Sequence, residues 1–206
     1  MTIYSIFKRG IDIVISLPVL VLLSPAFAAI VIAIRLGSKG PAVFKQQRAG
    51  KGGKPFTFYK FRTMKVDVEP FGPSPKSSDD PRLTRTGKFL REYSLDELPQ
   101  LLNVIKGDMS IVGPRPLYIS QIPEWNQRQK KRLLAKPGLT GLAQTQGRGE
   151  LTREQKLELD VKYVETASLW LDFKIILATI ANVLLRKGIY EKRYSQTEHT
   201  RGEGKQ

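Results

Sequence analysis

The sequence predicts an α+β fold in which helices dominate, with an apolar N-terminal helix pair attached to a small domain. An uncharged apolar run fills residues 13–34 and has a proline near its middle. Aromatic residues alternate with polar ones over residues 42–64, which predicts a β-hairpin, and later apolar residues recur at helical spacing. We expect a membrane helix pair at 1–36, a cytoplasmic domain at 37–192, and a disordered tail at 193–206.

The apolar run is long enough to cross a membrane, yet its sequence favours a segment that turns back. Its 22 residues would reach about 33 Å as a helix. Pro25, preceded by Ser24, removes a helical hydrogen bond and breaks or kinks the helix there. Basic residues flank the run on both sides, so charge gives a single crossing no preferred orientation. We therefore expect a re-entrant helix-break-helix with both ends on the cytoplasmic face. A straight span is the alternative, and Pro18 offers a second place to kink.

The predicted hairpin ends in basic residues. Phe56, Phe58, Lys60 and Arg62 alternate along the second strand and share one face. The glycine-rich turn at 51–55 lacks the spacings of phosphate-binding loops, so a plain hairpin turn is the better interpretation. Lys60 and Arg62 either reach an anion or remain solvated charges at a sheet edge.

The stretch from Arg91 to Gln100 organises the rest of the chain. It holds two adjacent carboxylates, Asp96 and Glu97. Ser94 and Glu97 fit a capping box, which would place Asp96 in the first turn of a helix, where the helix dipole favours an ionised carboxylate. A helix that begins only at Pro99, after a tighter turn, is the alternative.

An ionised carboxylate beside unpaired amides and arginines can attack or orient a phosphoryl group. The competing interpretation is that Asp96 and Glu97 only cap a surface helix. The rest of the composition strengthens the chemical interpretation. The chain has no cysteine, and its single histidine, His199, lies in the polar tail. Thiolate nucleophiles, Cys/His zinc sites and disulfides are excluded, which leaves carboxylates, Lys, Arg, hydroxyls or a bound hard cation.

The charge points to an anionic partner. Thirty-four Lys and Arg residues against 19 Asp and Glu give a formal net charge of +15 over 206 residues. Nucleic acid, an acidic membrane and phosphorylated substrates all fit such a charge. Because basic residues spread over the chain after residue 35, a dedicated nucleic-acid face is disfavoured.

Downstream of the carboxylates, one arginine stands on a stiff backbone. Leu101–Ile105 reads as a short apolar helix that Gly107 ends. Arg115 then lies between Pro114 and Pro116, both of which fix φ. A guanidinium held this way suits bidentate phosphate binding, and a structural salt bridge is the alternative.

The C-terminal half is predicted to be helical. Residues 119–134 read as one charged helix, and Thr152 with Gln155 forms a second capping-box pattern. Residues 169–185 are apolar but interrupted by polar and charged residues, so they suit a core or membrane-surface helix rather than a span.

Together these motifs resemble the small monotopic phosphoglycosyl transferases of the bacterial sugar transferase family. The likeness covers nearly the whole chain and rests on several motifs in the right order. These are the basic pair Lys8-Arg9, Ser24-Pro25, Tyr59–Met64, Ser94–Gln100, Gly107–Pro116, Pro137–Gln144, and Asp160, Tyr163 and Asp172.

The resemblance implies a reaction at the cytoplasmic face of the bacterial inner membrane. A UDP-sugar would donate a phosphosugar to polyprenol phosphate, giving polyprenyl-diphosphate-sugar and UMP, as the first membrane step of glycoconjugate synthesis (exopolysaccharide or lipopolysaccharide). Asp96 would be the nucleophile and form a covalent aspartyl-phosphosugar. Glu97 would act either as a base for the lipid phosphate or by positioning Asp96.

The resemblance also implies a cofactor and a set of cationic contacts. Mg²⁺ would bind at Asp96 and Glu97 and neutralise the charge of the diphosphate. Phosphate groups would be held by Lys60, Arg62, Arg91, Arg115 and Arg148. We expect membrane lipid but no nucleic acid among the partners.

A non-catalytic, membrane-tethered basic module that binds anionic lipid or nucleic acid is the alternative. It would account for the charge and the anchor. It would not account for two adjacent carboxylates set among arginines and followed by a rigid Pro-Arg-Pro.

Overall fold

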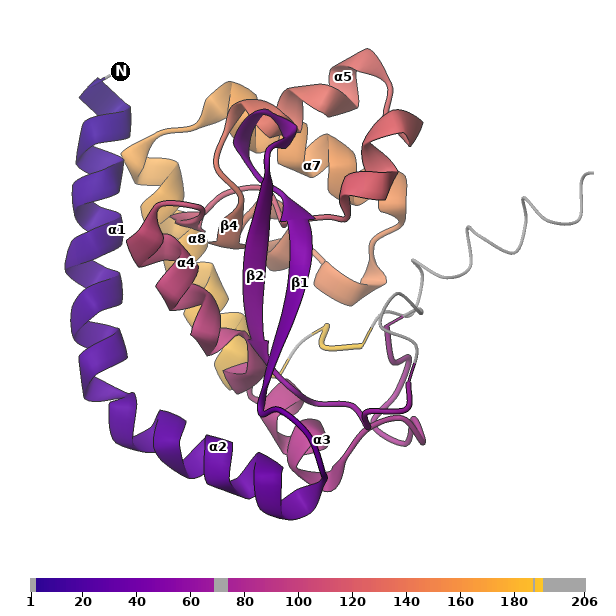
Figure 1. Cartoon of the computed structure of the whole chain (residues 1–206). Helices are drawn as coiled ribbons and strands as arrows, with labels where there is room; N and C mark the ends of the chain where they lie inside the picture. The colour runs from indigo at the N-terminus through magenta and orange to yellow at the C-terminus, as the bar shows by residue number, and fades with distance from the viewer. Residues whose placement is uncertain (1–2, 69–73, 187, 191–206) are drawn as a thin grey trace, which may run out of the picture.

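Two N-terminal helices run down one side of the domain and turn beneath it in the computed structural model, which describes residues 3–68, 74–186 and 188–190 (Figure 1). α1 spans Ile3–Leu22 and α2 spans Ser24–Gly37. They meet at an angle of 60°. Within the described residues, no single helix is both long enough and apolar enough to span a bilayer. The bent pair of α1 and α2, taken together, has the length and the composition to do so.

The helix break lies where the sequence predicts it. Pro25 occupies the first turn of α2, where a missing amide hydrogen costs little. The Ser24 hydroxyl donates a hydrogen bond to the carbonyl oxygen of Val21 at 2.8 Å, which satisfies one carbonyl freed by the break. Pro18, the second possible kink, lies inside α1.

Polar side chains fasten α1 to the domain. Arg9 donates to the backbone carbonyls of Val104 and Ile105 near the end of α4 (Leu101–Lys106). Asp12 is buried and accepts hydrogen bonds from the Ser110 hydroxyl at 3.0 Å and the Ile111 amide at 2.9 Å. The apolar N-terminal helix therefore packs as part of the domain.

The predicted hairpin is confirmed. β1 (Val43–Ala49) pairs antiparallel with β2 (Pro55–Phe61), in a register that sets Val43 opposite Phe61. A short 3-10 turn, η1 (Lys51–Gly53), joins them, and Gly52 adopts a φ of 67° that favours glycine. A second pairing is parallel and joins β3 (Ser110–Val112) to β4 (Gly138–Thr140).

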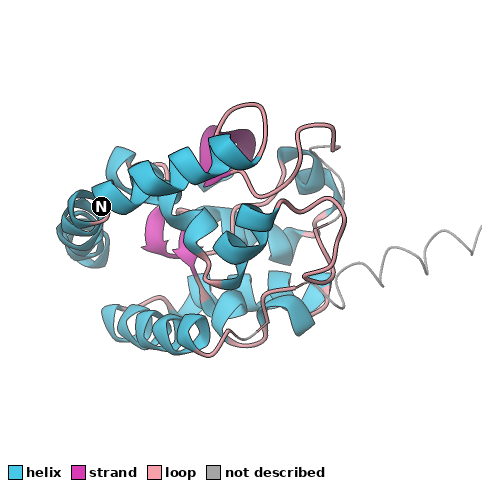
Figure 2. Cartoon of the chain, turned by 90° about the horizontal axis from the view of Figure 1, so that it is seen from below, coloured by secondary structure: helices cyan, strands magenta, loops and turns pink. Residues whose placement is uncertain are grey.

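Short helices surround these strands, as Figure 2 shows. The elements between β2 and β3 are α3 (Arg85–Glu92), η2 (Leu95–Gln100) and α4 (Leu101–Lys106). Gly107 ends α4 with a φ of 90°, as expected from the sequence. After β4 come α6 (Leu142–Thr145), η5 (Arg148–Glu150), α7 (Arg153–Thr166) and α8 (Leu169–Leu184). The capping box of Thr152 with Gln155 is present at the start of α7.

The prediction of one helix over residues 119–134 is wrong. The chain instead forms three short turns, which are η3 (Ile119–Glu124), α5 (Gln127–Lys130) and η4 (Lys131–Leu134). Pro123 lies inside η3 and cannot donate a helical hydrogen bond. Asn126 then starts a new helix, because its side chain accepts from the Gln129 amide at 2.8 Å.

Two apolar clusters hold the elements together. The larger lies between the hairpin, α4, β3, α7 and α8, and includes Phe58, Val104 and Tyr163. The smaller joins α2 to the end of the hairpin and α3 through Ile34, Phe61 and Leu90. The hairpin thus contacts both clusters, and this fixes the position of the residues at the end of β2.

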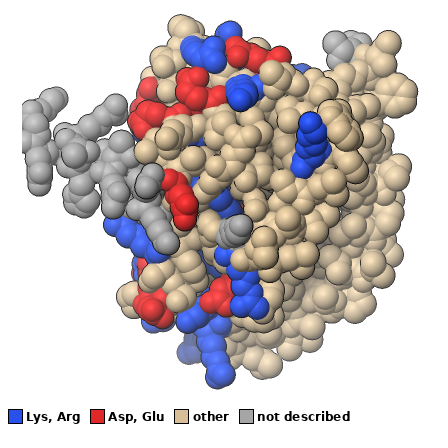
Figure 3. Space-filling view, turned by 180° about the vertical axis from the view of Figure 1, so that it is seen from behind, with Lys and Arg blue, Asp and Glu red and all other residues tan. Residues whose placement is uncertain are grey.

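α8 has one buried and one exposed apolar side. Asp172 and Ile175 face the interior, whereas Trp170, Phe173 and Leu184 are exposed. Figure 3 shows a broad surface with very little charge on the side where α1 and α8 lie. The prediction of a core or membrane-surface helix at 169–185 fits this two-sided burial. The predicted disordered tail, 193–206, lies outside the described residues.

Candidate active site

The two carboxylates stand on the tight turn η2, which leads directly into α4. Ser94 precedes the turn in the left-handed region, with a φ of 55°, and its side chain makes no capping bond. The predicted capping box of Ser94 with Glu97 is therefore wrong, and a tighter turn precedes the helix instead. The Ser94 hydroxyl accepts a hydrogen bond from Arg148 Nη2 at 3.0 Å, which helps to hold this strained residue.

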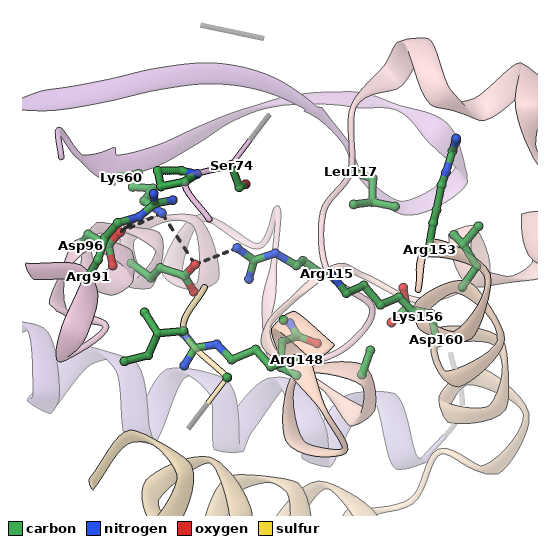
Figure 4. Close-up of a pocket in the computed structure, with 18 residues that line it drawn as sticks. Lys60, Ser74, Arg91, Asp96, Arg115, Leu117, Arg148, Arg153, Lys156 and Asp160 are labelled. Carbon is green, nitrogen blue, oxygen red and sulfur yellow. Dashed lines mark hydrogen bonds and ion pairs between the residues drawn. The ribbon is translucent and has the colours of Figure 1, made fainter. Parts of the chain in front are cut away.

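Six of the predicted site residues meet around this turn, although they come from several distant segments (Figure 4). Asp96 is 3% exposed, and its Oδ2 lies 2.8 Å from Lys60 Nζ and 3.8 Å from Arg91 Nε. Glu97 Oε1 lies 2.8 Å from Arg115 Nη2 and 3.8 Å from Lys60 Nζ. Lys60 thus bridges the two carboxylates, and each carboxylate has a further guanidinium partner.

These contacts set the charge state of Glu97. Burial alone would raise the pKa of Glu97, but the positive charges of Arg115 and Lys60 outweigh it and hold the pKa below its ordinary value. Burial lowers the pKa of Lys60, and the charge of Asp96 opposes that shift. Glu97 is therefore ionised at neutral pH, and its negative charge is already compensated.

The carboxylates border a small cavity of about 80 Å³. Arg148 lines it as well, so the cavity is bordered by six cationic side chains and three carboxylates. Figure 4 shows Lys60 and Arg91 beside Asp96 at one end of the cavity, with Arg153, Lys156 and Asp160 at the other. The excess of positive charge suits an anionic ligand such as a diphosphate.

Arg153 and Lys156 are cavity residues that sequence reasoning did not single out. Both lie in the first turns of α7 and line the cavity. In the sequence they read as ordinary charges on an exposed helix, and no motif distinguishes them. Only the packing of α7 against α6 and η4 brings them to the site.

Arg62 is the one predicted phosphate-binding residue that does not join the group. Its Nη1 donates to the Lys39 carbonyl at 2.7 Å, and its Nη2 donates to the Ser38 carbonyl at 2.8 Å. The side chain is buried and borders a neighbouring cavity, not the one that contains Asp96 and Glu97. Phosphate binding by Arg62 stays a prediction. In the structure, the hydrogen bonds of Arg62 connect the end of β2 to the residues that follow α2.

A buried ion pair supports the Pro-Arg-Pro segment. Arg132 Nη2 lies 2.7 Å from Asp160 Oδ2 and also donates to the backbone carbonyl of Arg115. Trp125 covers the guanidinium, with its ring centroid 4.8 Å away. The backbone at Arg115, which the two flanking prolines are predicted to make rigid, is therefore also held by its hydrogen bond from Arg132.

The carboxylate pair could supply the protein ligands of a magnesium ion, provided that phosphate oxygens and water complete the shell. Among the described residues, no group of three acidic, histidine or cysteine side chains could hold a metal ion. Mg²⁺ usually takes one or two protein carboxylates and completes its shell with phosphate oxygens and water. Asp96 and Glu97 supply that number, next to a basic cavity for the phosphates.

A pair of adjacent carboxylates surrounded by Lys60, Arg91, Arg115 and Arg148 is an arrangement that suits phosphoryl transfer. The sequence profile of the bacterial sugar transferases matches residues 3–186. The chain therefore belongs to the bacterial sugar transferase family, and the predicted resemblance is confirmed.

Individual relatives agree with this assignment. An uncharacterized sugar transferase, EpsL, of Bacillus subtilis is 43% identical over 199 residues, which cover 97% of this chain and 98% of EpsL. A UDP-glucose:undecaprenyl-phosphate glucose-1-phosphate transferase of Escherichia coli is 41% identical over 193 residues, 90% of this chain and 42% of the relative. The enzyme of the same name from Caulobacter vibrioides is 43% identical over 196 residues, 89% of this chain and 72% of the relative.

The chain thus spans nearly all of one relative and less than half of another. Each of these relatives is named as a transferase. Nothing in the comparisons supports the alternative of a non-catalytic basic module.

Proposed function

We propose that this chain is a phosphoglycosyl transferase that moves a phosphosugar from a UDP-sugar to polyprenol phosphate, giving polyprenyl-diphosphate-sugar and UMP. The observation that carries the proposal is the buried Asp96 carboxylate, held by Lys60 and Arg91 at one end of a basic cavity. Relatives that match 89% or more of this chain carry this type of reaction in their names. The product would begin the membrane stage of glycoconjugate synthesis.

In the first step, an Asp96 oxygen attacks the sugar-linked phosphorus of the donor. The bond from that phosphorus to the bridging oxygen breaks, and its electron pair leaves with UMP. Lys60 and Arg115 both line the cavity and stabilise the charge that develops on the phosphate oxygens. The phosphosugar is then bonded to Asp96 as an acyl phosphate. The choice of Asp96 as the nucleophile follows the family resemblance, and its side chain is the less exposed of the two, 4% against 13%.

In the second step, a phosphate oxygen of polyprenol phosphate attacks the same phosphorus. The bond to Asp96 breaks, and its electron pair returns to the carboxylate. Because Arg115 and Lys60 hold the pKa of Glu97 below its ordinary value, this residue is a poor acceptor for a proton from the lipid phosphate, whose own pKa is about 6. Of its two predicted roles, positioning therefore has the stronger support.

Mg²⁺ held at Asp96 and Glu97 would neutralise the charge of the donor diphosphate. The protein's own residues favour its arrival with the donor, because the cavity is already positively charged before substrate binds. Full UMP release in excess chelator would exclude this role.

The acceptor requires a membrane surface, and the proposed topology supplies one. We propose that α1 and α2 enter and leave the cytoplasmic face of the inner membrane as a re-entrant pair. Exposed apolar side chains along α1, α2 and α8 would contact lipid. The net positive charge of +15 favours an anionic leaflet.

A donor-only assay tests the proposed function. With labelled UDP-sugars and no acceptor, the protein should release up to one equivalent of UMP and retain the labelled phosphosugar on Asp96. Asp96→Asn should abolish both signals, whereas Glu97→Gln should retain part of the first step. Near-normal UMP release by Asp96→Asn would refute the nucleophile. If UMP appears only when both substrates are present, direct transfer is the mechanism.

A further inference from the structure

A third cavity, of about 320 Å³ and with largely apolar walls, adjoins Glu97 on the side of α8. Residues of η2, β4 and α8 line it. Its apolar walls are Leu95, Leu98, Leu139, Ile176, Ile180 and Val183. Glu97, Arg115 and Arg148 border this cavity and also the basic one, so the two cavities meet at the active site.

The polar groups on the α8 side of this cavity are satisfied within the protein. The Thr140 and Thr179 hydroxyls lie 2.7 Å apart, and Thr179 also donates to the Ile175 carbonyl. Asn182 Nδ2 donates to the Thr145 carbonyl at 3.1 Å. The walls on this side therefore favour an apolar ligand over a polar one.

The junction, where this apolar cavity meets the basic cavity, is polar and positively charged. Gln144 borders both cavities, and its buried Nε2 and Oε1 have no hydrogen-bond partner among the described residues. Buried amide groups are normally paired, so this one indicates a polar ligand group at the junction. Arg115 and Arg148 lie at the same end and favour an anion there.

The far wall continues into the exposed side of α8. Ile180 lines the cavity and is still 52% exposed, and Leu184, one turn further on, is exposed as well. A ligand with an anionic head at the junction and a hydrocarbon body would therefore run from the active site toward an apolar outer surface.

We infer that this cavity holds the first isoprene units of the acceptor, with the acceptor phosphate at Arg115 and Arg148. The inference rests on the proposed function and assigns a separate place to each substrate. The donor diphosphate occupies the basic cavity, and the prenyl chain reaches the active site along α8. Glu97 stands where the two cavities meet, between donor and acceptor.

A matched pair of variants on one helix tests this assignment. Ile180 and Leu177 are both apolar residues of α8, 52% and 50% exposed, but only Ile180 is among the residues that line the cavity. Ile180→Asn and Leu177→Asn are compared in the full-length protein in detergent micelles, with undecaprenyl phosphate as acceptor. UMP release without acceptor and product formation with acceptor are measured separately.

Ile180→Asn should raise KM for undecaprenyl phosphate about tenfold and leave donor-only UMP release unchanged. Leu177→Asn should change neither value by more than about twofold. Equal increases in KM for both variants would overturn the assignment, because they would reflect a general effect of the apolar surface. An unchanged KM in both would overturn it too, as would a loss of donor-only UMP release confined to Ile180→Asn.

A second variant fills the cavity. Val183→Trp should slow transfer to undecaprenyl phosphate but not to geranyl phosphate, whose short chain needs less of the cavity. If the cavity instead holds an acyl chain of a structural phospholipid, both acceptors will respond alike, and the inference is wrong. Failure of the proposed function is a different result, because the unmodified protein would then release no UMP from any UDP-sugar.

Discussion

Arg132 and Asp160 show how residues that need not touch substrate can determine the geometry of the site. The Arg132 and Asp160 side chains are 2% and 3% exposed, and Arg132 also holds the backbone carbonyl of Arg115. Loss of one partner from a buried ion pair is far more harmful than replacement of both, because the remaining charge is left buried and uncompensated. Stability and positioning can therefore be separated by mutation.

We predict that Arg132→Met lowers the free energy of unfolding by about 3 kcal/mol or more. The double variant Arg132→Met with Asp160→Leu should recover much of that loss, since no buried charge remains. It should still show a raised KM for the UDP-sugar, because the Arg115 carbonyl loses its donor. Urea unfolding and donor kinetics provide the two readouts. A stable double variant with unmodified kinetics would show that the pair has no positioning role.

Glu97 gives a pH prediction whose sign follows from its contacts. The pKa of Glu97 is held below its ordinary value of 4.5 in the folded protein, because Arg115 and Lys60 outweigh the effect of burial. As the pH falls below that value, the unfolded chain takes up a proton that the folded protein does not, so stability is lost. The contribution of Glu97 is therefore fully present at neutral pH and declines in acid.

The comparison between the unmodified protein and Glu97→Gln should show this decline directly. The difference in their unfolding free energies should be largest at about pH 7 and should shrink between about pH 4.5 and pH 3. Urea titrations followed by tryptophan fluorescence are suitable, since Trp125 is buried and its environment changes on unfolding. A difference that is constant over this range would mean that the folded and unfolded pKa values of Glu97 are equal.

Among the elements, those with local signals were predictable and those that depend on distant partners were not. The hairpin follows from period-two alternation, and the end of α4 at Gly107 follows from a glycine. The parallel pairing of β3 with β4 joins two short segments far apart in the chain, and neither carries a strand pattern of its own. The break at Pro123 has a local cause that the prediction of a single charged helix overlooked.

The same distinction holds for the candidate site. Asp96 and Arg115 could be found because each stands in an unusual local sequence, an acidic pair and a Pro-Arg-Pro. Arg132, Arg153 and Lys156 could not, since their importance depends on how α7 and η4 pack beside the site. Segments with an ordinary surface pattern can therefore contain residues of a candidate active site.

Arg62 connects two secondary-structure elements, because its hydrogen bonds join the end of β2 to the end of α2. We predict that Arg62→Gln lowers the free energy of unfolding by about 2 kcal/mol or more, since charged hydrogen bonds to buried carbonyls are lost. KM for the UDP-sugar should stay within about twofold of the unmodified value. Lys60→Gln is the matched comparison, because Lys60 lies two residues before Arg62 but contacts Asp96 and Glu97. This variant should raise the KM for the UDP-sugar at least about tenfold. A similar rise for Arg62→Gln would support its predicted contact with phosphate.

At the scale of the whole molecule, the proposed reaction requires the apolar surface and the active site to lie at one membrane face. The N-terminal helices wrap one side and the underside of the domain, and α8 presents further apolar side chains (Figure 1, Figure 3). Polyprenol phosphate carries its charge at the membrane surface, so the carboxylates have to lie close to that plane. A re-entrant α1–α2 pair satisfies this condition, because the helix that ends near Arg35 returns to the face from which α1 entered.

The bend at Ser24 and Pro25 is the feature on which this topology depends. Replacement by Ala and Leu restores the lost hydrogen bond and produces an unbroken apolar helix long enough to span. We predict that this double variant moves the N-terminus across the membrane and loses transferase activity. Because the chain has no native cysteine, single cysteines at position 2 and in the tail report sidedness through an impermeant thiol reagent. In the protein with the native bend, both cysteines should react only from the cytoplasmic side. Labelling of the two cysteines from opposite sides would mean that the helix pair spans the membrane, and the polyprenol phosphate would then have to reach Asp96 by another arrangement.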